Sequence, residues 1–368
     1  MKLTLARISL LSTAASVAML ASGAAFAQAE VPEGYPADYA ALIEAAQAEG
    51  SVSLYGVMNS EQAAALQEAF SEKYGIEVTY NDLGTVGVFN RVISEAAAGQ
   101  MGADVVESSA LEMQMQLVSD GNAEPYASPE AGALPEWANY QDTLYAISIE
   151  PVAMIYNTTE LTAEEIPTTR PDLITFLNEN TDRLQGKVAA YDPQKSGTGF
   201  MLHTNDIRET DNFWELAEAM GANDLSTYSS SGAIKESVVS GENVLGINIP
   251  GSYALAWAEE SPNLGVAFGE DYTAAFSRTM FVPEGAPHPN AGKLFLDFVL
   301  SHEGQSALAQ VGMPSPRSDV EEGLNIDEIS EMVGGNLRPI AIDEGLLEYM
   351  QQDARVGFFR QWSEATGQ

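Results

Sequence analysis

Cysteine is absent from the 368-residue sequence, and basic residues are scarce. The lack of cysteine excludes disulfides, thiolate metal sites, cysteine nucleophiles and lipid attachment through cysteine. Only 16 lysines and arginines stand against 53 acidic residues, which gives a net charge of −37. Such a chain repels phosphate backbones, so we expect no nucleic-acid partner. Hydrophobic residues make up 45% of the chain, which is enough for sizeable cores, and the length suits about two domains.

The N-terminus has the pattern of a secretory signal peptide. A short basic region contains Lys2 and Arg7, and an apolar stretch follows it. The Ala-Phe-Ala sequence at 25–27 has the small-x-small form that signal peptidase reads. We therefore expect cleavage after Ala27, which makes 1–27 the signal peptide and places the mature chain in the periplasm. An uncleaved membrane anchor is the alternative, and the polar residues inside the apolar stretch disfavour it.

The mature chain alternates short apolar strands with amphipathic helices. The first strands are expected at 51–55, 76–80 and 103–106, with helices between them at 61–74 and 90–98. This order predicts a parallel sheet covered by helices on both faces. Such sheets bind ligands where loops leave the carboxyl ends of the strands. The loops at 56–60, 84–87 and 107–110 are therefore candidate binding segments.

A second α/β unit follows the first. An extended segment is expected at 146–156, and a second one returns at 271–282. Between them lie further strands and helices, and the tail beyond residue 290 is helix-rich, with a last helix at 345–364. This arrangement predicts two α/β units connected by extended segments.

Several segments along the mature chain carry a family resemblance, including those at 70–78, 154–157, 190–199, 239–242 and 290–305. The sequence Ala-Tyr-Asp-Pro-Gln-Lys-Ser-Gly-Thr-Gly at 190–199 is one of them. The chain resembles extracellular solute-binding proteins of ABC importers, in the group that includes periplasmic ferric-ion-binding proteins.

This resemblance implies an α/β, two-lobed clamshell of the type II-like kind, in which each lobe is a mixed sheet flanked by helices. Lobe one would comprise 28–147 and 279–368, and lobe two would comprise 148–271. A two-strand hinge would cross near 148–154 and 272–278. The protein would be a monomer without enzymatic activity. It would close on a solute and deliver it to an ABC permease in the inner membrane.

Three loops rich in small hydroxyl residues are candidates for holding the solute. Small residues let backbone N–H groups approach an anion, and a helix N-terminus adds partial positive charge. The expected hydrogen-bond donors are Ser108, Ser109, Ser196, Gly197, Thr198 and Ser230. At each of these positions an ordinary capped turn is the alternative interpretation.

Arg278 and Tyr253 complete the expected anion site. A guanidinium in the hinge can donate two hydrogen bonds to a carboxylate, phosphonate or phosphate. Equally, Arg278 can pair with one of the many acids, and Tyr253 can line the cleft wall. Asn59 and Ser60 follow a strand and are candidate donors too, although either can cap the next helix.

Ferric iron is the main alternative cargo, because phenolates and carboxylates suit it. The resemblance implies an adjacent tyrosine pair after the strand at 244–248, where this chain has Ser252-Tyr253, and no two of its 14 tyrosines are adjacent. A histidine of some relatives falls near Asn59, and a glutamate falls near Ser109. These replacements favour an organophosphonate, sugar phosphate or carboxylate and no cofactor, with Fe3+ bound through Tyr253 as the alternative.

A periplasmic hydrolase is a further alternative. His203 follows the loop that contains Ser196, and Asp192 or Asp206 is close in sequence. No G-x-S-x-G elbow is present, and closeness in sequence does not predict triad geometry. The sequence therefore favours a binding protein over an enzyme.

Overall fold

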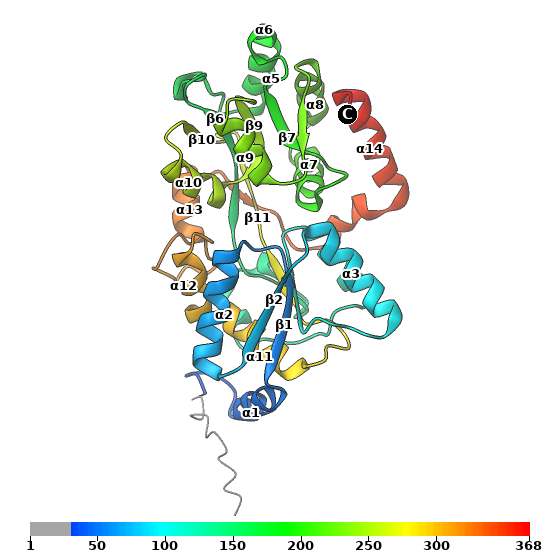
Figure 1. The fold of residues 1–368 in the computed structure, drawn as a ribbon, viewed down its shortest axis with the longest axis vertical. Coiled ribbons are helices and arrows are strands. Elements are labelled where there is room, and N and C mark those ends of the chain that lie inside the picture. Colours follow the sequence, from blue (N-terminus) through cyan, green and yellow to red (C-terminus); the bar gives the residue numbers. More distant parts are fainter. Residues whose placement is uncertain (1–30) are drawn as a thin grey trace, which may run out of the picture.

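The computed structural model describes residues 31–368, which form two lobes stacked along the long axis of the molecule (Figure 1). Each lobe is built on a mixed sheet flanked by helices, so the expected fold class is confirmed. The expected signal peptide at 1–27 lies outside the described residues. Within residues 31–368, no helix combines the length and the apolar character needed to cross a membrane.

The first sheet defines lobe one and has the strand order β2-β1-β3-β12-β5-β4. The first three strands are parallel, as expected, and β12 runs antiparallel between β3 and β5. The strands are β1 (Ser51–Gly56), β2 (Glu77–Asp82), β3 (Val105–Ser108), β4 (Asn139–Tyr140), β5 (Leu144–Ala146) and β12 (Thr279–Phe281). The helices are α1 (Tyr39–Glu49), α2 (Ser60–Tyr74), α3 (Thr85–Ala98), α4 (Leu111–Ser119), α11 (Pro289–Leu300), α12 (His302–Gln310) and α13 (Ile326–Met332), with short turns η1 (Ala131–Ala133) and η2 (Glu136–Ala138).

The second sheet defines lobe two and has the order β13-β11-β6-β9-β7-β8, with β10 also paired to β6. Here β7 is parallel to β8 and β9, whereas β6 is antiparallel to its neighbours. The strands are β6 (Glu150–Asn157), β7 (Val188–Tyr191), β8 (Ser226–Tyr228), β9 (Leu245–Pro250), β10 (Leu264–Phe268), β11 (Thr273–Phe276) and β13 (Leu337–Pro339). The helices are α5 (Arg170–Glu179), α6 (Thr181–Leu184), α7 (Gly197–Glu209), α8 (Phe213–Ala222), α9 (Ser231–Val239) and α10 (Gly251–Glu260), with the turn η3 (Ala163–Glu165).

The C-terminal segment departs from the expected division into lobes. We expected 279–368 to lie entirely in lobe one, but β13 pairs with β11 in the sheet of lobe two. The last helix, α14 (Gln352–Thr366), packs against α8 of lobe two. A third connection therefore joins the lobes, in addition to the two expected hinge crossings. The helix expected at 345–364 is also divided, because the backbone is extended at Gln351 between η4 (Glu344–Met350) and α14.

A buried carboxylate anchors α11 inside lobe one. Asp297 is 1% exposed, and its Oδ2 accepts hydrogen bonds from the phenols of Tyr39 at 2.7 Å and Tyr126 at 2.6 Å. Burial raises the pKa of Asp297 to about 6, because the apolar surroundings disfavour the charged form. Ionisation of Asp297 at neutral pH therefore lowers the stability of the folded protein.

Candidate functional site

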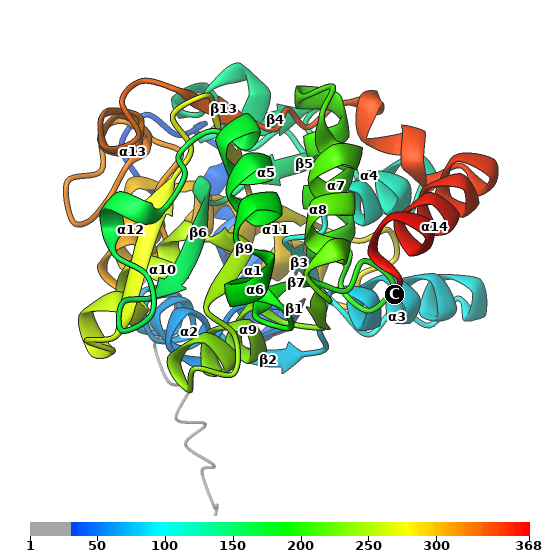
Figure 2. The ribbon, with the colours of Figure 1, turned by 90° about the horizontal axis from the view of Figure 1, so that it is seen from above.

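A cavity of about 160 Å³ lies between the two lobes. Its walls come from loops that follow the carboxyl ends of strands in both sheets, as expected for parallel α/β units. The lining residues used below are Asp82, Thr85, Ser109, Tyr191, Ser196, Thr198, Ser229, Ser230, Ser231, Tyr253 and Arg278. Helix α7 of lobe two contacts α3 and α4 of lobe one, and all three helices lie on the same side of the molecule in the view from above (Figure 2). The cavity is thus walled by both halves of the molecule.

Serine hydroxyls at two helix N-termini of lobe two face this cavity. Ser196 caps α7, and its Oγ accepts the Gly199 N–H at 3.1 Å. Ser230 caps α9 in the same way and accepts the Ala233 N–H at 3.3 Å. A hydroxyl that accepts one hydrogen bond still has its own hydrogen to donate. Capping and solute binding are therefore compatible roles for these two serines.

Direct contacts join the lobes beside the cavity. The hydroxyls of Ser109 and Thr198 lie 2.8 Å apart, and the Gly197 N–H donates to Thr85 Oγ1 at 3.1 Å. A Cβ atom at Gly197 would lie 2.9 Å from the Ala110 Cβ across the interface. Gly197 is therefore required for the close approach of the two lobes, and Ser109 and Thr198 contact each other.

Arg278 is held by the protein on every side. It is 3% exposed, and its Nε donates to Glu150 at 2.9 Å, while Glu107 lies 3.6 Å from Nη1. Nη1 also donates to the Val57 carbonyl, and Nη2 donates to the Tyr253 hydroxyl at 2.9 Å. Both carboxylates are fully buried, and burial raises the pKa of Glu107. Of the two alternatives for Arg278, the structure shows pairing with acidic residues, which balance its charge inside the protein.

Two phenols line the cavity, those of Tyr191 and Tyr253, whereas only Tyr253 was expected from the sequence. Tyr253 accepts from Arg278 and donates to Gln62 Oε1 at 3.1 Å, which joins α10 of lobe two to α2 of lobe one. Tyr191 is the last residue of β7 and is 3% exposed. Burial raises the pKa of both phenols, so the protein favours their neutral form. Tyr191 stands inside the segment 190–199, which is where the sequence indicated a site.

Four expected site residues do not line the cavity, and one of them, Gly197, lies at the contact between the lobes described above. Asn59 accepts the Gln62 N–H at 2.9 Å in a capping box at the start of α2, and Ser60 is exposed beside it. Ser108 is buried and accepts the Ala110 N–H at 3.2 Å. For Asn59, Ser60 and Ser108, local structural roles account for the contacts.

Other lining residues were not singled out individually from the sequence. Thr85 stands in the candidate segment 84–87, which was expected to be a loop but begins α3 in the structure, and Ser229 and Ser231 flank Ser230. Asp82 is the one carboxylate among the lining residues, and it ends β2. All four residues lie at or after the carboxyl end of a strand, and this position is the feature of the sequence that could have identified them.

The histidine of the hydrolase alternative lies outside the cavity. His203 is 1% exposed and packs against Trp362, with 4.4 Å between the ring centroids. Its Nε2 lies 3.3 Å from the Tyr191 carbonyl oxygen. Burial lowers its pKa, which favours the neutral ring. His203 therefore has the contacts of a packed helix residue.

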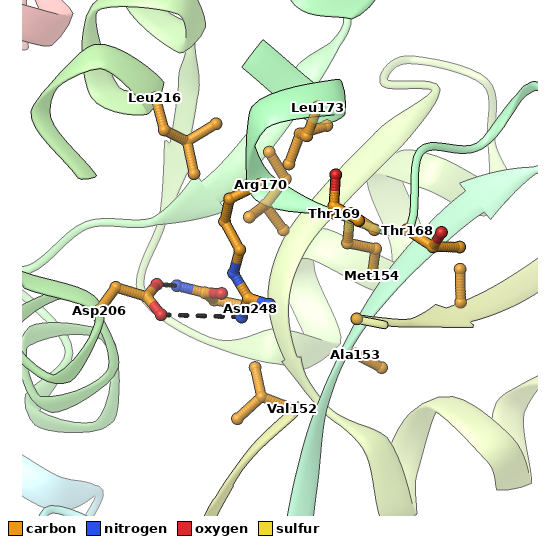
Figure 3. Close-up of a pocket in the computed structure, with 13 residues that line it drawn as sticks. Val152, Ala153, Met154, Thr168, Thr169, Arg170, Leu173, Asp206, Leu216 and Asn248 are labelled. Atoms are coloured by element: carbon orange, nitrogen blue, oxygen red, sulfur yellow. Dashed lines mark hydrogen bonds and ion pairs between the residues drawn. The ribbon is translucent and has the colours of Figure 1, made fainter. Parts of the chain in front are cut away.

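A smaller cavity of about 30 Å³ lies within lobe two (Figure 3). Its polar residues satisfy one another: Asp206 accepts from Asn248 at 2.8 Å and from Tyr272 at 2.8 Å, and Arg170 pairs with Asp271 at 2.6 Å. This volume has room for water and is too small for a typical organic solute. The interlobe cavity is therefore the candidate solute site.

The two lobes and the cavity between them define a solute-binding protein of the clamshell class. The chain belongs to the bacterial extracellular solute-binding protein family, which it matches over residues 65–332. It is similar to the substrate-binding protein of an ABC transporter from Agrobacterium tumefaciens, with 34% identity and a TM-score of 0.81. That match covers 86% of this chain and 94% of the other. The chain is accordingly a transport substrate-binding protein.

Two more distant structures share the fold. The periplasmic binding protein AfuA from Actinobacillus pleuropneumoniae, with exogenous fructose-6-phosphate bound, is 21% identical and has a TM-score of 0.71, over 86% of this chain and 99% of that one. Iron-bound HitA from Pseudomonas aeruginosa is 17% identical and has a TM-score of 0.68, over the same shares of the two chains. The same fold therefore holds different cargoes in different proteins.

Proposed function

We propose that this protein is the periplasmic receptor of an ABC importer and that it binds a small organic anion between its lobes. The observation that supports this proposal is the composition of the interlobe cavity. Its walls carry the hydroxyls of Ser109, Ser196, Thr198 and Ser230, together with Tyr253, and they include one carboxylate. A ligand that touches both walls stabilises the closed form, because its contacts differ between the open and closed states. The closed form is then presented to an inner-membrane permease.

Hydrogen-bond donors, rather than net positive charge, characterise the cavity. Helices α3, α7, α9 and α10 all have lining residues in their first turn or at the N-cap. Helix N-termini favour anions, and hydroxyls donate to anion oxygens. Arg278 is neutralised by its own carboxylates. A ligand with several acceptor oxygens, such as a sugar phosphate, organophosphonate or carboxylate, fits these donors.

Ferric iron is the second candidate, and it is favoured by the pair of phenols. Tyr191 and Tyr253 both line the cavity with Asp82, which gives a set of hard oxygen donors. Against iron, Asp82 is the one carboxylate among the lining residues, and most of the other polar lining groups are neutral hydroxyls. Within residues 31–368, no group of three histidine or acidic side chains is placed to hold a metal. We therefore place the organic anion first.

A thermal-shift screen separates the two candidates. The panel contains sugar phosphates, organophosphonates, carboxylates and ferric citrate. A ligand at 100 times its Kd stabilises the native state by about 2.7 kcal/mol, which is about 4 °C for a chain of this length. We expect an organic anion to produce this shift without iron. A shift that needs iron, with a colour that Tyr253→Phe abolishes, would establish the second candidate instead.

A hydroxyl deletion tests the location of the site. Thr198→Val removes one hydroxyl and keeps the side-chain shape, and we expect it to weaken binding about tenfold, by about 1.4 kcal/mol. Ser240→Ala is the control, because the Ser240 hydroxyl donates to the Ser237 carbonyl at the end of α9, away from the cavity lining. Equal affinities in the two variants would contradict the site.

A further inference from the structure

Glu112 is a buried acid at the interface between the lobes, outside the cavity. It stands in the first turn of α4 in lobe one and is fully buried. Its Oε1 forms a hydrogen bond with Thr204 Oγ1, which belongs to α7 of lobe two. The first turn of that same α7 carries Thr198, and Ser196 caps it. Glu112 therefore connects lobe one to the helix that supplies two of the proposed solute contacts.

Thr204 compensates an ionised Glu112 only in part. Its hydroxyl has one hydrogen and two acceptors within reach, Glu112 Oε1 and the Met201 carbonyl oxygen at 3.0 Å. When Glu112 is ionised, that hydrogen satisfies one of the two acceptors. A protonated Glu112 can donate its own hydrogen to Thr204 Oγ1, which leaves the hydroxyl hydrogen for Met201. The neutral acid therefore satisfies both contacts at once.

The surroundings of Glu112 support the same protonation state. Oε2 is buried and has no hydrogen-bond partner, which is costly for an ionised oxygen. Burial raises the pKa of Glu112 to about 8, and Thr204, Arg208 and Arg355 only partly offset it.

Other charged groups on the elements around α4 have partners of their own or are neutral. On η4, Glu344 accepts from Tyr140, and Glu348 lies 3.8 Å from Arg208. On α3, Arg91 pairs with Glu95 at 2.6 Å. On α7, Asp206 accepts from Asn248 and Tyr272, and burial favours the neutral form of His203. No nearby pairing therefore provides Glu112 with a full counter-charge within the described residues.

We propose that closing the cleft takes up one proton at Glu112, which makes Glu112 a positioning residue that holds α7 against α4 more strongly in its neutral form. This inference rests on the proposed function for its consequence, a solute affinity that depends on pH. When the lobes open, water reaches the carboxyl group and it ionises at its ordinary pKa. The closed form keeps the proton at higher pH than the open form does. The ratio of closed to open protein therefore falls as pH rises, by up to tenfold per pH unit between about pH 5 and 8.

The test measures closure without any solute, so its outcome is independent of the ligand screen. The chain has no native cysteine, so Ser94→Cys on α3 and Glu236→Cys on α9 give two exposed label positions in opposite lobes. Distances between spin labels at these positions are measured by electron–electron double resonance from pH 5 to pH 9. We expect the short-distance population to decrease across this range.

Two variants on the labelled background identify the titrating group. Glu112→Gln mimics the neutral acid, because its amide can donate to Thr204, and it should keep the short-distance population at all pH values. Glu68→Gln removes an exposed acid and should leave the profile unchanged. A labelled parent without pH dependence, or a Glu112→Gln variant with the parent's profile, would overturn the proposal.

Discussion

We predict that substitution of Arg278 by glutamine lowers the stability of the folded protein even when no ligand is bound. The guanidinium is 3% exposed and faces two fully buried carboxylates, at 2.9 Å to Glu150 and 3.6 Å to Glu107. Removing one partner of a buried ion pair costs about 3–5 kcal/mol, because an uncompensated charge stays behind. The unfolding entropy of a chain of this length is about 0.7 kcal/mol/K. We therefore expect the melting temperature of Arg278→Gln to fall by about 4–7 °C at pH 7.

Calorimetry on a mutant cycle measures this effect. Arg278→Gln combined with Glu150→Gln removes the charge that the single variant leaves unpaired, so the double variant should recover much of the lost melting temperature. Glu107→Gln serves as the second arm, since its carboxylate lies farther from the guanidinium. A single variant that melts within 1 °C of the parent, and yet loses solute binding, would refute the reasoning. In that case Arg278 serves the ligand and not the hinge.

Two further predictions concern the interior of lobe one and the lobe interface. Asp297 binds more protons in the folded state than in the unfolded state between pH 3.8 and about 6, so its contribution to stability is lost as pH rises through that window, by about 3 kcal/mol. Asp297→Asn should abolish this loss, and denaturant titrations at pH 4 and pH 7 measure it as a free energy of unfolding. At pH 7 the variant should be at least as stable as the parent. Gly197→Ala places a Cβ 2.9 Å from the Ala110 Cβ of the other lobe and should weaken solute binding at least tenfold, measured by calorimetric titration, without lowering the melting temperature.

Each of these predictions has a control in the chain. For the lobe interface, Gly232→Ala adds the same methyl group in the first turn of α9, where nothing lies within 4 Å, and it should leave affinity unchanged. For the buried acid, the amide oxygen of asparagine can accept from both phenols that donate to Oδ2, so hydrogen bonding is retained. An Asp297→Asn protein that keeps the parent's pH dependence would assign the effect to another group. Equal affinities for the two glycine variants would contradict the account of the interface.

Local sequence patterns predicted much of lobe one. Alternating strands and helices gave the three parallel strands, and the glycines after α1, α2 and α3 all have the left-handed φ that ends a helix. A cap at Asn59 was also expected from the local pattern, and the structure shows it, extended to a capping box by Gln62. Such features depend on residues three or four apart, which a single sequence displays directly.

The return of the C-terminus to lobe two was not predictable in this way. An amphipathic helix such as α14 shows that one face is buried, but not which lobe buries it. The pairing of β13 with β11 joins segments that are far apart in the chain. Assigning 279–368 to lobe one followed from the family resemblance and was wrong for this last part.

In the candidate site, too, local features could be predicted from the sequence and long-range contacts could not. Hydroxyl-rich loops after strands were visible in the sequence, and Ser109, Ser196, Thr198 and Ser230 do meet at one cavity. That Ser109 and Thr198 would contact each other depends on how two separate lobes close. The sequence displays chemical groups, whereas their partners are set by long-range packing.

A crystal structure with the anion that gives the largest thermal shift tests the central claim most directly. We expect an anion between the lobes, within hydrogen-bond distance of Thr198 or Ser196 on one side and Thr85 or Ser109 on the other. A ligand that touches a single lobe, or a ferric ion coordinated by Tyr253, would contradict it.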